Sequence, residues 1–395
     1  MNVVVTTELH FDRTPDGRVW SSGSLSFWTR YLAVFDSVRI VARVRNVPDP
    51  PPGFRLLSNP NITFADVPDY LGPEQYLLRL TSVAAATAKA VQNNDAVILR
   101  VPGRIGTCVE SQLRKMRRPF GVEVVGDPFD VFAPGGVRHP LRPLFRRWFT
   151  HRLRLVCGRA CAAAYVTEQA LQRRYPPAPQ AFVTHYSSVE LPPTAFVKAP
   201  RTATSVDVSK LIFVGTMAQL YKAPDVLIDA VKMCVNDGRD VELVLVGSGR
   251  YQLKVESRAT AHGLANRVQF RGQLTTPEAV RAELDQADLF VLPSRQEGLP
   301  RAMIEAMARA LPCLGSTVGG IPELVSPEDL VPPNDAPALA HKICEVLADP
   351  SRMARMSARN LQKARDYSDG TLTSRRKAFY EHLRACTESW LEGRR

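Results

Sequence analysis

One stretch of the sequence decides the fold, because it joins an apolar strand to a helix through a polar turn. It reads Leu289-Phe290-Val291-Leu292-Pro293-Ser294-Arg295-Gln296-Glu297-Gly298-Leu299-Pro300-Arg301-Ala302-Met303-Ile304-Glu305. The four leading apolar residues predict a strand buried on both faces, and Pro300 suits the first turn of a helix. This order is typical of one unit of an open α/β sheet.

The turn between this strand and helix has the chemistry of an anion site. The amides of Gly298, Leu299 and Arg301 would point out of the positively polarised start of the helix, a natural position for phosphate. Glu297 precedes that start, and Glu305 lies over one turn inside the helix. Two carboxylates so placed could bind hydroxyl groups on either side of a diphosphate, or they could be ordinary helix glutamates.

Short apolar runs and stretches of helical period alternate in both halves of the chain, as in parallel sheets with crossover helices. The strands that we expect in the first half are Asn2 to Thr6, Val38 to Val44, Ile62 to Asp66, Ala96 to Arg100, Gly121 to Gly126 and Ala163 to Thr167. Those in the second half are Lys210 to Val214, Glu242 to Val246, Val268 to Phe270, Leu289 to Leu292 and Pro312 to Ser316. Two similar sets predict two doubly wound α/β domains.

A proline-dense stretch separates the two sets, and we place the linker near residues 196–208. The predicted domains are therefore residues 1–197 and residues 198–373. Residues 374–395 have helical period, and this helix could cap the second domain or cross back to the first.

Composition excludes several classes of protein. The 395 residues suffice for two domains at about 150 residues each, and 45% hydrophobic with 23% charged residues is the balance of a globular enzyme. We find neither a signal peptide nor an apolar run of membrane-spanning length, so we expect a cytoplasmic protein. The seven cysteines are scattered and contain no Cys-x-x-Cys pair, which argues against a disulfide framework or a zinc ribbon.

The positive charge is concentrated in one segment. Residues 111–160 hold eleven basic side chains and three acidic ones, which accounts for +8 of the net charge of +12. This concentration of positive charge suits binding to an anionic membrane, a phosphorylated substrate or nucleic acid. No nucleic-acid-binding module is recognisable, so we expect no nucleic acid. Residues 142–154 mix arginine with aromatic residues at helical spacing, which fits a helix on anionic lipid or one that packs its aromatic residues into the core.

At this point the sequence resembles a known family. The pair Glu297-Gly298-Leu299-Pro300 and Glu305-Ala306-Met307-Ala308 is similar to the Glu-x7-Glu signature of the retaining glycosyltransferases of family 4. Three further segments resemble the family's other motifs: Phe213-Val214-Gly215 with Lys222-Ala223-Pro224-Asp225-Val226-Leu227, then Val244-Leu245-Val246-Gly247-Ser248-Gly249, then Thr317-Val318-Gly319-Gly320-Ile321-Pro322-Glu323-Leu324. All four stand in the family's order.

The resemblance implies the GT-B fold, in which two Rossmann-like doubly wound domains face each other across a cleft. The second domain would hold a nucleotide-sugar donor and the first an acceptor. In the family's pattern Glu297 contacts the donor sugar, Glu305 the ribose hydroxyls and Lys222 the diphosphate. The donor-binding residues implied in this way are Gly215, Thr216, Lys222, Gly247, Gly272, Gln273, Glu297, Gly298, Leu299, Pro300, Arg301 and Glu305.

Two departures from the family's pattern concern the chemistry. Thr216 stands where the family usually has an arginine on the diphosphate, and Arg301 or Arg100 could replace that cation. Asp127 stands near the place where the family commonly has a histidine. It could accept a hydrogen bond from the attacking hydroxyl, or it could be a turn aspartate before proline. The catalytic residues that we expect are Glu297, Lys222 and Asp127.

The resulting prediction is a retaining hexosyltransferase that uses a nucleoside-diphosphate sugar, with UDP-sugars preferred over GDP-sugars, and no other cofactor. Its acceptor would be a saccharide or a lipid-linked hydroxyl in polysaccharide or glycolipid synthesis, with contact to the inner face of an anionic membrane. Because no Asp-x-Asp and no His-Glu-x-x-His occurs, we expect no catalytic metal. A sugar-nucleotide epimerase of the same architecture stays open. So does a catalytically silent sugar-nucleotide-binding partner.

Overall fold

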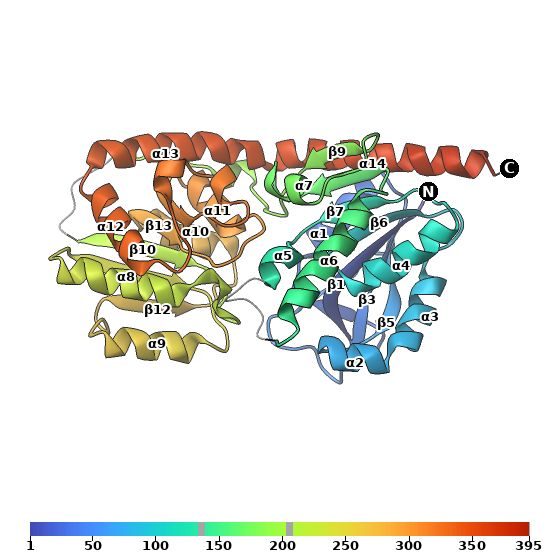
Figure 1. The fold of residues 1–395 in the computed structure, drawn as a ribbon, viewed down its shortest axis with the longest axis horizontal. Coiled ribbons are helices and arrows are strands. Elements are labelled where there is room, and N and C mark those ends of the chain that lie inside the picture. The colour runs from blue at the N-terminus through green and yellow to red at the C-terminus, as the bar shows by residue number, and fades with distance from the viewer. Residues whose placement is uncertain (133–138, 203–207, 395) are drawn as a thin grey trace. The chain divides into compact units, whose positions relative to one another are not determined.

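The structure is a computed structural model that describes residues 1–132, 139–202 and 208–394. It has two compact units (Figure 1). The first unit contains Met1–Pro128, Arg147–Tyr186 and Thr373–Arg395, and the second contains Phe129–Arg146 and Ser187–Leu372. The long segment of the second unit begins at Ser187, whereas the predicted boundary was residue 197. Of the predicted linker, residues 203–207 lie outside the described residues.

The first unit is built on a sheet of nine strands in the order β4-β2-β1-β6-β7-β8-β9, with β3 and β5 beyond β1. These strands are β1 (Val3–Arg13), β2 (Val19–Ser21), β3 (Val38–Asn46), β4 (Arg55–Leu56), β5 (Ile62–Pro68), β6 (Ala96–Val101), β7 (Gly121–Val124), β8 (Ala162–Tyr165) and β9 (Phe182–His185). Its helices are α1 (Leu25–Thr29), α2 (Gly72–Leu78), α3 (Leu80–Ala90), α4 (Arg104–Lys115), α5 (Pro128–Val131), α6 (Arg142–Cys157), α7 (Ala170–Arg174) and most of α14 (Asp369–Glu392). The division into units falls within α6, and α5 straddles it.

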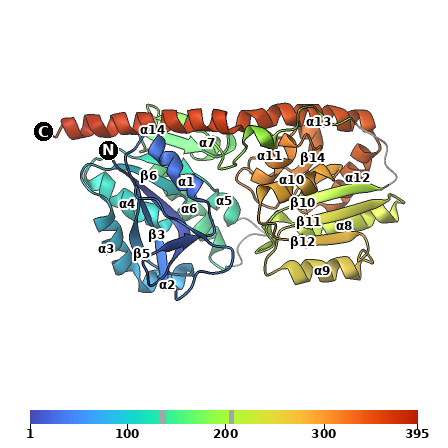
Figure 2. The ribbon, with the colours of Figure 1, turned by 180° about the vertical axis from the view of Figure 1, so that it is seen from behind.

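Helices cover both faces of this sheet, which explains why its central strands are buried and mostly apolar. Figure 1 shows α3, α4 and α6 over one face, and Figure 2 shows α1 over the other. All four residues of β7 and of β8 are buried. Such strands read as continuous apolar runs, as parallel strands do when both faces are covered.

The second unit has six parallel strands in the order β12-β11-β10-β13-β14-β15. They are β10 (Ser209–Val214), β11 (Val241–Val246), β12 (Val268–Gly272), β13 (Leu289–Leu292), β14 (Cys313–Ser316) and β15 (Leu330–Val331). The helices are α8 (Pro224–Asn236), α9 (Gln252–Ala261), α10 (Pro277–Asp285), α11 (Arg301–Ala308), α12 (Ala336–Leu347) and α13 (Pro350–Ala364). Helix α8 packs against α9 and α12, and α11 packs against α10 and α13.

The prediction of two doubly wound α/β domains is confirmed. Each of the eleven expected strands is present, and Leu289–Leu292 forms β13 with the predicted bounds. Strand β1 is longer than expected, because it continues past a register shift between Thr6 and His10. Beyond the shift it pairs with β3 and β2 and no longer with β6. The short strands β2, β4, β9 and β15 were not predicted.

The C-terminal helix α14 completes the first unit from residue 373 onward. Phe379, Tyr380 and Leu383 are fully buried. A Cβ atom at Gly121 of β7 would lie 2.8 Å from the Phe379 ring, so only glycine fits at that position in the strand. Apart from α14, the described helices are shorter than a membrane span, and α14 lacks the apolar character of one.

A buried ionic cluster joins α14 to the sheet of the first unit. The Glu123 carboxylate of β7 pairs with Arg30 and Arg100, and the hydroxyls of Tyr31 and Tyr186 donate hydrogen bonds to it at 3.0 Å and 2.9 Å. Burial alone would raise the pKa of Glu123, but the two arginines and the two hydroxyls hold that pKa below its usual value. The ring of Tyr380 lies 5.0 Å from that of Tyr31 and closes the cluster from α14.

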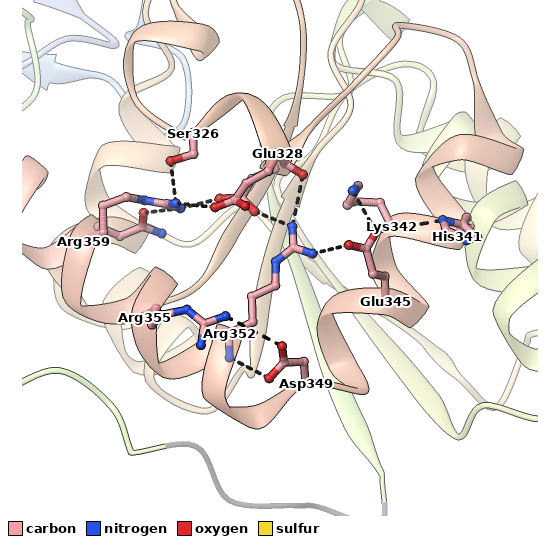
Figure 3. Close-up of polar contacts among 11 residues, drawn as sticks. Ser326, Glu328, His341, Lys342, Glu345, Asp349, Arg352, Arg355 and Arg359 are labelled. Atoms are coloured by element: carbon pink, nitrogen blue, oxygen red, sulfur yellow. Dashed lines mark hydrogen bonds and ion pairs between the residues drawn. The ribbon is translucent and has the colours of Figure 1, made fainter.

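The second unit has its own ionic cluster, centred on the fully buried Asp329. Figure 3 labels its arginines, Arg352 and Arg359. Arg352 and Arg359 of α13 both pair with this carboxylate. Arg352 also pairs with Glu345 of α12 and donates a hydrogen bond to the Glu328 carbonyl oxygen at 3.1 Å. The cluster therefore fixes the last strand of the sheet to α12 and α13.

We predict that Glu123→Gln lowers the free energy of unfolding by about 3–5 kcal/mol, because it leaves two buried guanidinium groups without their counter-charge. Urea unfolding at pH 7, followed by circular dichroism, measures this. The control is Glu381→Gln on α14, where the carboxylate pairs with Lys377 and both side chains are 56% exposed. That exposed pair should contribute no more than about 1 kcal/mol. Equal losses in the two variants would contradict the prediction.

Candidate active site

The order of strands in the second sheet creates a switch point between β10 and β13. These two strands pair directly, with Leu211 opposite Leu289 and Ile212 opposite Phe290. From β10 the chain moves on to β11 and β12 on one side, and from β13 it moves to β14 and β15 on the other. Ligands of open α/β sheets bind outside the carboxyl ends of the strands at such a point.

The loops that leave these two strands bring Lys222 and Glu297 together. Lys222 ends the short 3-10 helix η3 (Leu220–Lys222), and its Nζ donates a hydrogen bond to Glu297 Oε1 at 2.6 Å. The Ser294 hydroxyl donates to the same oxygen at 3.0 Å. The side chains of Lys222 and Glu297 are only 15% and 8% exposed, so the ion pair is largely shielded from solvent. The structure thus joins two residues that lie 75 positions apart in the chain.

Ser294 is a residue whose role sequence reasoning missed. It is fully buried, and its carbonyl oxygen accepts a hydrogen bond from the buried Ser316 hydroxyl of β14 at 2.6 Å. Ser294 therefore fixes the Glu297 carboxylate to two neighbouring strands of the sheet. Its position two residues after the end of β13 was a usable signal, but only the coordinates show what it contacts.

The other glycine-containing turns along this edge also come together. A Cβ atom at Gly247, whose φ is +128°, would lie 2.0 Å from the Gly215 carbonyl oxygen, so the two turns touch through their backbones. The Gly247 amide donates to the Gly272 carbonyl oxygen at 2.7 Å, and the Ser248 hydroxyl lies 3.3 Å from Gln273 Oε1. The structure therefore places the predicted residues of β10, β11 and β12 along one edge of the sheet.

Thr216 has a structural role in the same edge. Its hydroxyl donates to the Ser248 carbonyl oxygen at 3.3 Å and accepts from the Ala218 amide at 3.1 Å. It bridges the turns after β10 and β11, and it supplies no positive charge.

Helix α11 begins beside the Lys222–Glu297 pair. Its N-cap residue is Pro300, and no side chain caps it. The backbone N–H groups of Gly298, Leu299 and Arg301 donate no hydrogen bond to any other described residue. Three donors thus remain at the positive end of a helix dipole, as an anion site requires.

Glu305 lies on α11 one turn inside the helix and is partly buried. Burial raises the pKa of its carboxyl group, and the positive charges of Arg301 and Arg281 act against that increase. Burial and the negative charge of Glu297 likewise raise the pKa of Tyr221, while Arg301 lowers it. The exposed Arg301 is therefore close enough to influence both of these groups electrostatically.

The predicted residues of the first half of the chain belong to the first unit. Asp127 follows β7 and is buried, and its carboxylate accepts hydrogen bonds from Arg174 and from the Tyr175 hydroxyl. Arg100 pairs with Glu123. Within the parts of the chain that the structure describes, no three His, Cys, Asp or Glu side chains form a group that could hold a metal ion.

Residues 208–349, which contain this edge of the sheet, match the sequence family described as Glycosyl transferases group 1. The second unit carries a group 1 glycosyl transferase domain.

Two relatives are similar to more of the chain than residues 208–349. Protein CapJ of Staphylococcus aureus is 28% identical over 326 residues, which are 81% of this chain and 80% of CapJ. The GDP-mannose-dependent monoacylated alpha-(1-6)-phosphatidylinositol monomannoside mannosyltransferase of Corynebacterium glutamicum is 32% identical over 215 residues, which are 49% of this chain and 55% of that enzyme. These matches, with the group 1 domain, support glycosyltransferase activity.

A solved structure shows the same fold. The sucrose-phosphate synthase of Thermosynechococcus elongatus matches with a TM-score of 0.72 at 18% identity, over 98% of this chain and 99% of that one. The predicted GT-B fold is confirmed.

We predict that Glu305→Gln raises the midpoint of thermal unfolding at pH 8. The folded-state pKa of Glu305 is raised, so the unfolded chain gives up this proton at lower pH than the folded protein does. Glu305 therefore lowers stability once the pH exceeds its unfolded pKa, and glutamine removes that cost. Scanning calorimetry at pH 4 and pH 8 measures the effect. The difference between variant and wild type should be smaller at pH 4, and a variant that is less stable at pH 8 would contradict the prediction.

Proposed function

We propose that this protein is a retaining glycosyltransferase of family 4, which moves a hexose from a nucleoside-diphosphate sugar to a hydroxyl group of a saccharide or a lipid-linked acceptor. The observation that carries the proposal is the contact between Lys222 and Glu297 beside the N-terminus of α11. A cation, a carboxylate and three backbone donors at one switch point match the needs of a sugar diphosphate.

In this proposal the diphosphate lies at the start of α11. The amides of Gly298, Leu299 and Arg301 and the ammonium of Lys222 contact its oxygens. Glu297 then faces the hydroxyls of the donor sugar, and Glu305 faces the ribose. Charge that builds up on the departing diphosphate meets fixed donors, which is where most of the rate enhancement should arise.

The reaction forms one bond and breaks one bond at the anomeric carbon. The acceptor hydroxyl attacks from the face that the diphosphate leaves, and a departing phosphate oxygen takes the hydroxyl proton. Neither Glu297 nor Glu305 forms a covalent intermediate, unlike the nucleophile of a retaining glycosidase. Lys222 and the helix amides supply the positive charge, so we propose that no catalytic metal is needed. Asp127, which Arg174 and Tyr175 hold in place, would only orient the acceptor.

Two further features bear on the donor. Thr216 binds backbone groups, so we assign the second diphosphate cation to Arg301 rather than to Arg100, which already pairs with Glu123. The turn Gly272–Gln273 would hold the base. We propose that this base is uracil rather than guanine.

We also propose that the first unit contacts an anionic membrane at the cytoplasmic face. Arg147, Trp148, His151 and Arg154 share the exposed side of α6, so its basic face carries an aromatic ring. The buried residues of α6 are Thr150, Leu153, Val156 and Cys157, which anchor the opposite side of the helix. A helix that mixes arginine and tryptophan on its exposed side suits the boundary of anionic lipid.

Helix α2 adds exposed leucines to this surface. Arg104 lies over the Tyr76 ring of α2 at 4.5 Å and over the Trp148 ring of α6 at 5.1 Å, so it links the two helices. Leu77 and Leu78, at the end of α2, are 67% and 85% exposed. Two exposed leucines beside a basic helix are what insertion into an acyl boundary requires.

The donor proposal predicts that Lys222→Ala lowers kcat about 100-fold, because the leaving group loses a fixed cation. Glu297→Gln should lower kcat at least about tenfold. Release of UDP from UDP-hexoses, with and without acceptor, measures turnover, and GDP-mannose is the second donor to test. Lys254→Ala on the exposed side of α9 is the control and should match wild type.

Three outcomes would contradict the donor proposal. Wild-type rates in both folded site variants would remove the roles of Lys222 and Glu297. Conversion of the donor without an acceptor into an isomeric nucleotide sugar would show an epimerase. Nucleotide-sugar binding without any turnover would show a silent binding protein.

The membrane proposal predicts that the wild-type protein floats with vesicles that contain phosphatidylglycerol and not with pure phosphatidylcholine vesicles. The double variant Leu77→Ser/Leu78→Ser should bind at least about tenfold more weakly, because fully burying one leucine is worth roughly 1.5–3 kcal/mol. Leu253→Ser on α9, where the leucine is 76% exposed, is the matched control and should bind as wild type does. Unchanged binding of the double variant would refute this surface.

A further inference from the structure

Arg295 connects the two loops that carry Lys222 and Glu297. It lies in the β13–α11 loop, and its backbone N–H donates to the Tyr221 carbonyl oxygen at 2.7 Å. Its guanidinium Nη1 donates to the Leu220 carbonyl oxygen at 2.5 Å. Both Nη atoms pair with the two oxygens of Asp225 at 2.8 Å each. One residue thus binds the chain on both sides of Lys222.

The segment that Arg295 binds contains a strained residue. Ala223, directly after Lys222, is fully buried and has a φ of +54° and a ψ of +45°. A residue with a Cβ atom avoids this left-handed region unless its surroundings enforce it. Leu220 and Tyr221 precede Ala223 and Asp225 follows it, so Arg295 binds both flanks of the strained position.

Arg295 also reaches a second strained residue. Its Nε donates to Asn334 Oδ1 at 2.6 Å, and Asn334 has a φ of +65°. The four non-glycine residues with positive φ in the described part of the chain are Arg117, Ala223, Ala310 and Asn334. Arg295 therefore contacts the surroundings of two of them, and its guanidinium is committed to protein partners.

We infer that Arg295 is a positioning residue, which holds the ammonium of Lys222 at the place where the leaving diphosphate is stabilised. This inference rests on the proposed function. Arg295 does not touch the donor in this scheme and acts through the backbone around Lys222. Lysine cannot replace it, because only the planar guanidinium can bind Asp225 with two parallel hydrogen bonds while it also reaches Leu220 and Asn334.

The kinetic test uses Arg295→Met and, in case that variant does not fold, Arg295→Lys. A shifted Lys222 weakens a contact that matters most in the transition state, so kcat should fall at least about tenfold while the KM for the donor changes less than about threefold. The pH profile of kcat should keep its shape. Wild-type kcat in a folded Arg295 variant would overturn the inference.

The chain offers a matched control in Arg309. This arginine pairs with both oxygens of Asp285 at 2.7 Å and donates to the Ala195 carbonyl oxygen at 3.0 Å, so it makes the same kinds of bond away from the site. Arg309→Met should cost stability without a loss of kcat. An equal fall of kcat in the two variants would show that the effect is structural, and would overturn the inference.

A second readout separates this inference from the proposed function. The rate at which an N-hydroxysuccinimide ester acylates Lys222, measured by peptide mass spectrometry, requires no turnover. It should rise at least about threefold in the Arg295 variants relative to wild type and to Arg309→Met, because the ammonium leaves its shielded pair with Glu297. If the wild type turns over no donor, the proposed function fails, and the labelling ratio still decides the role of Arg295. Unchanged labelling of Lys222 would overturn the inference that Arg295 positions this residue.

Discussion

The pairing of β10 with β13 is the constraint on which the candidate site depends. These strands are neighbours in the sheet, but the helices and strands from α8 to α10 separate them in the sequence. Hydrogen bonds between Leu211, Ile212 and their partners set the register. That register in turn fixes where the loops that carry Lys222 and Glu297 begin. The 2.6 Å contact between the two side chains is a consequence of this register. The turns that follow β11 and β12 are then placed by the same sheet.

Several of the arginines that give this chain its net charge of +12 have a structural role. Many of its guanidinium groups bind backbone carbonyl oxygens at the ends of helices and loops. Arg201 reaches the carbonyls of Leu284, Ala287 and Arg309, and Arg118 reaches those of Gln92 and Asp95. These bonds go to carbonyl oxygens at helix and loop ends, where backbone hydrogen bonding is incomplete. Part of the positive charge that the sequence shows is therefore internal structure and not a surface for a partner.

The sequence alone was sufficient to predict the elements whose local residue pattern matches their structure. Buried parallel strands such as Leu289–Leu292 are apolar runs that can be read directly, and Pro300 marks the start of α11 as expected. Sequence reasoning could not find the strands β4 and β15, because two residues are too few to show a hydrophobic period. Nor could it find Arg295, because its partners Leu220, Asp225 and Asn334 come together only through the sheet. The family resemblance named Lys222 and Glu297, whereas their direct contact and the role of Ser294 required coordinates.

The C-terminal helix has a consequence for how the protein is made. Residues 373–394 belong to the first unit, although the whole second unit precedes them in the chain. Phe379 and Leu383 cover the surface of β7 around Gly121. During translation they can do so only after they have emerged from the ribosome. Domains usually mature in the order of their synthesis. Here the unit that is begun first is completed last, and this surface of β7 stays without its α14 cover in a nascent chain for as long as the second unit is being synthesised.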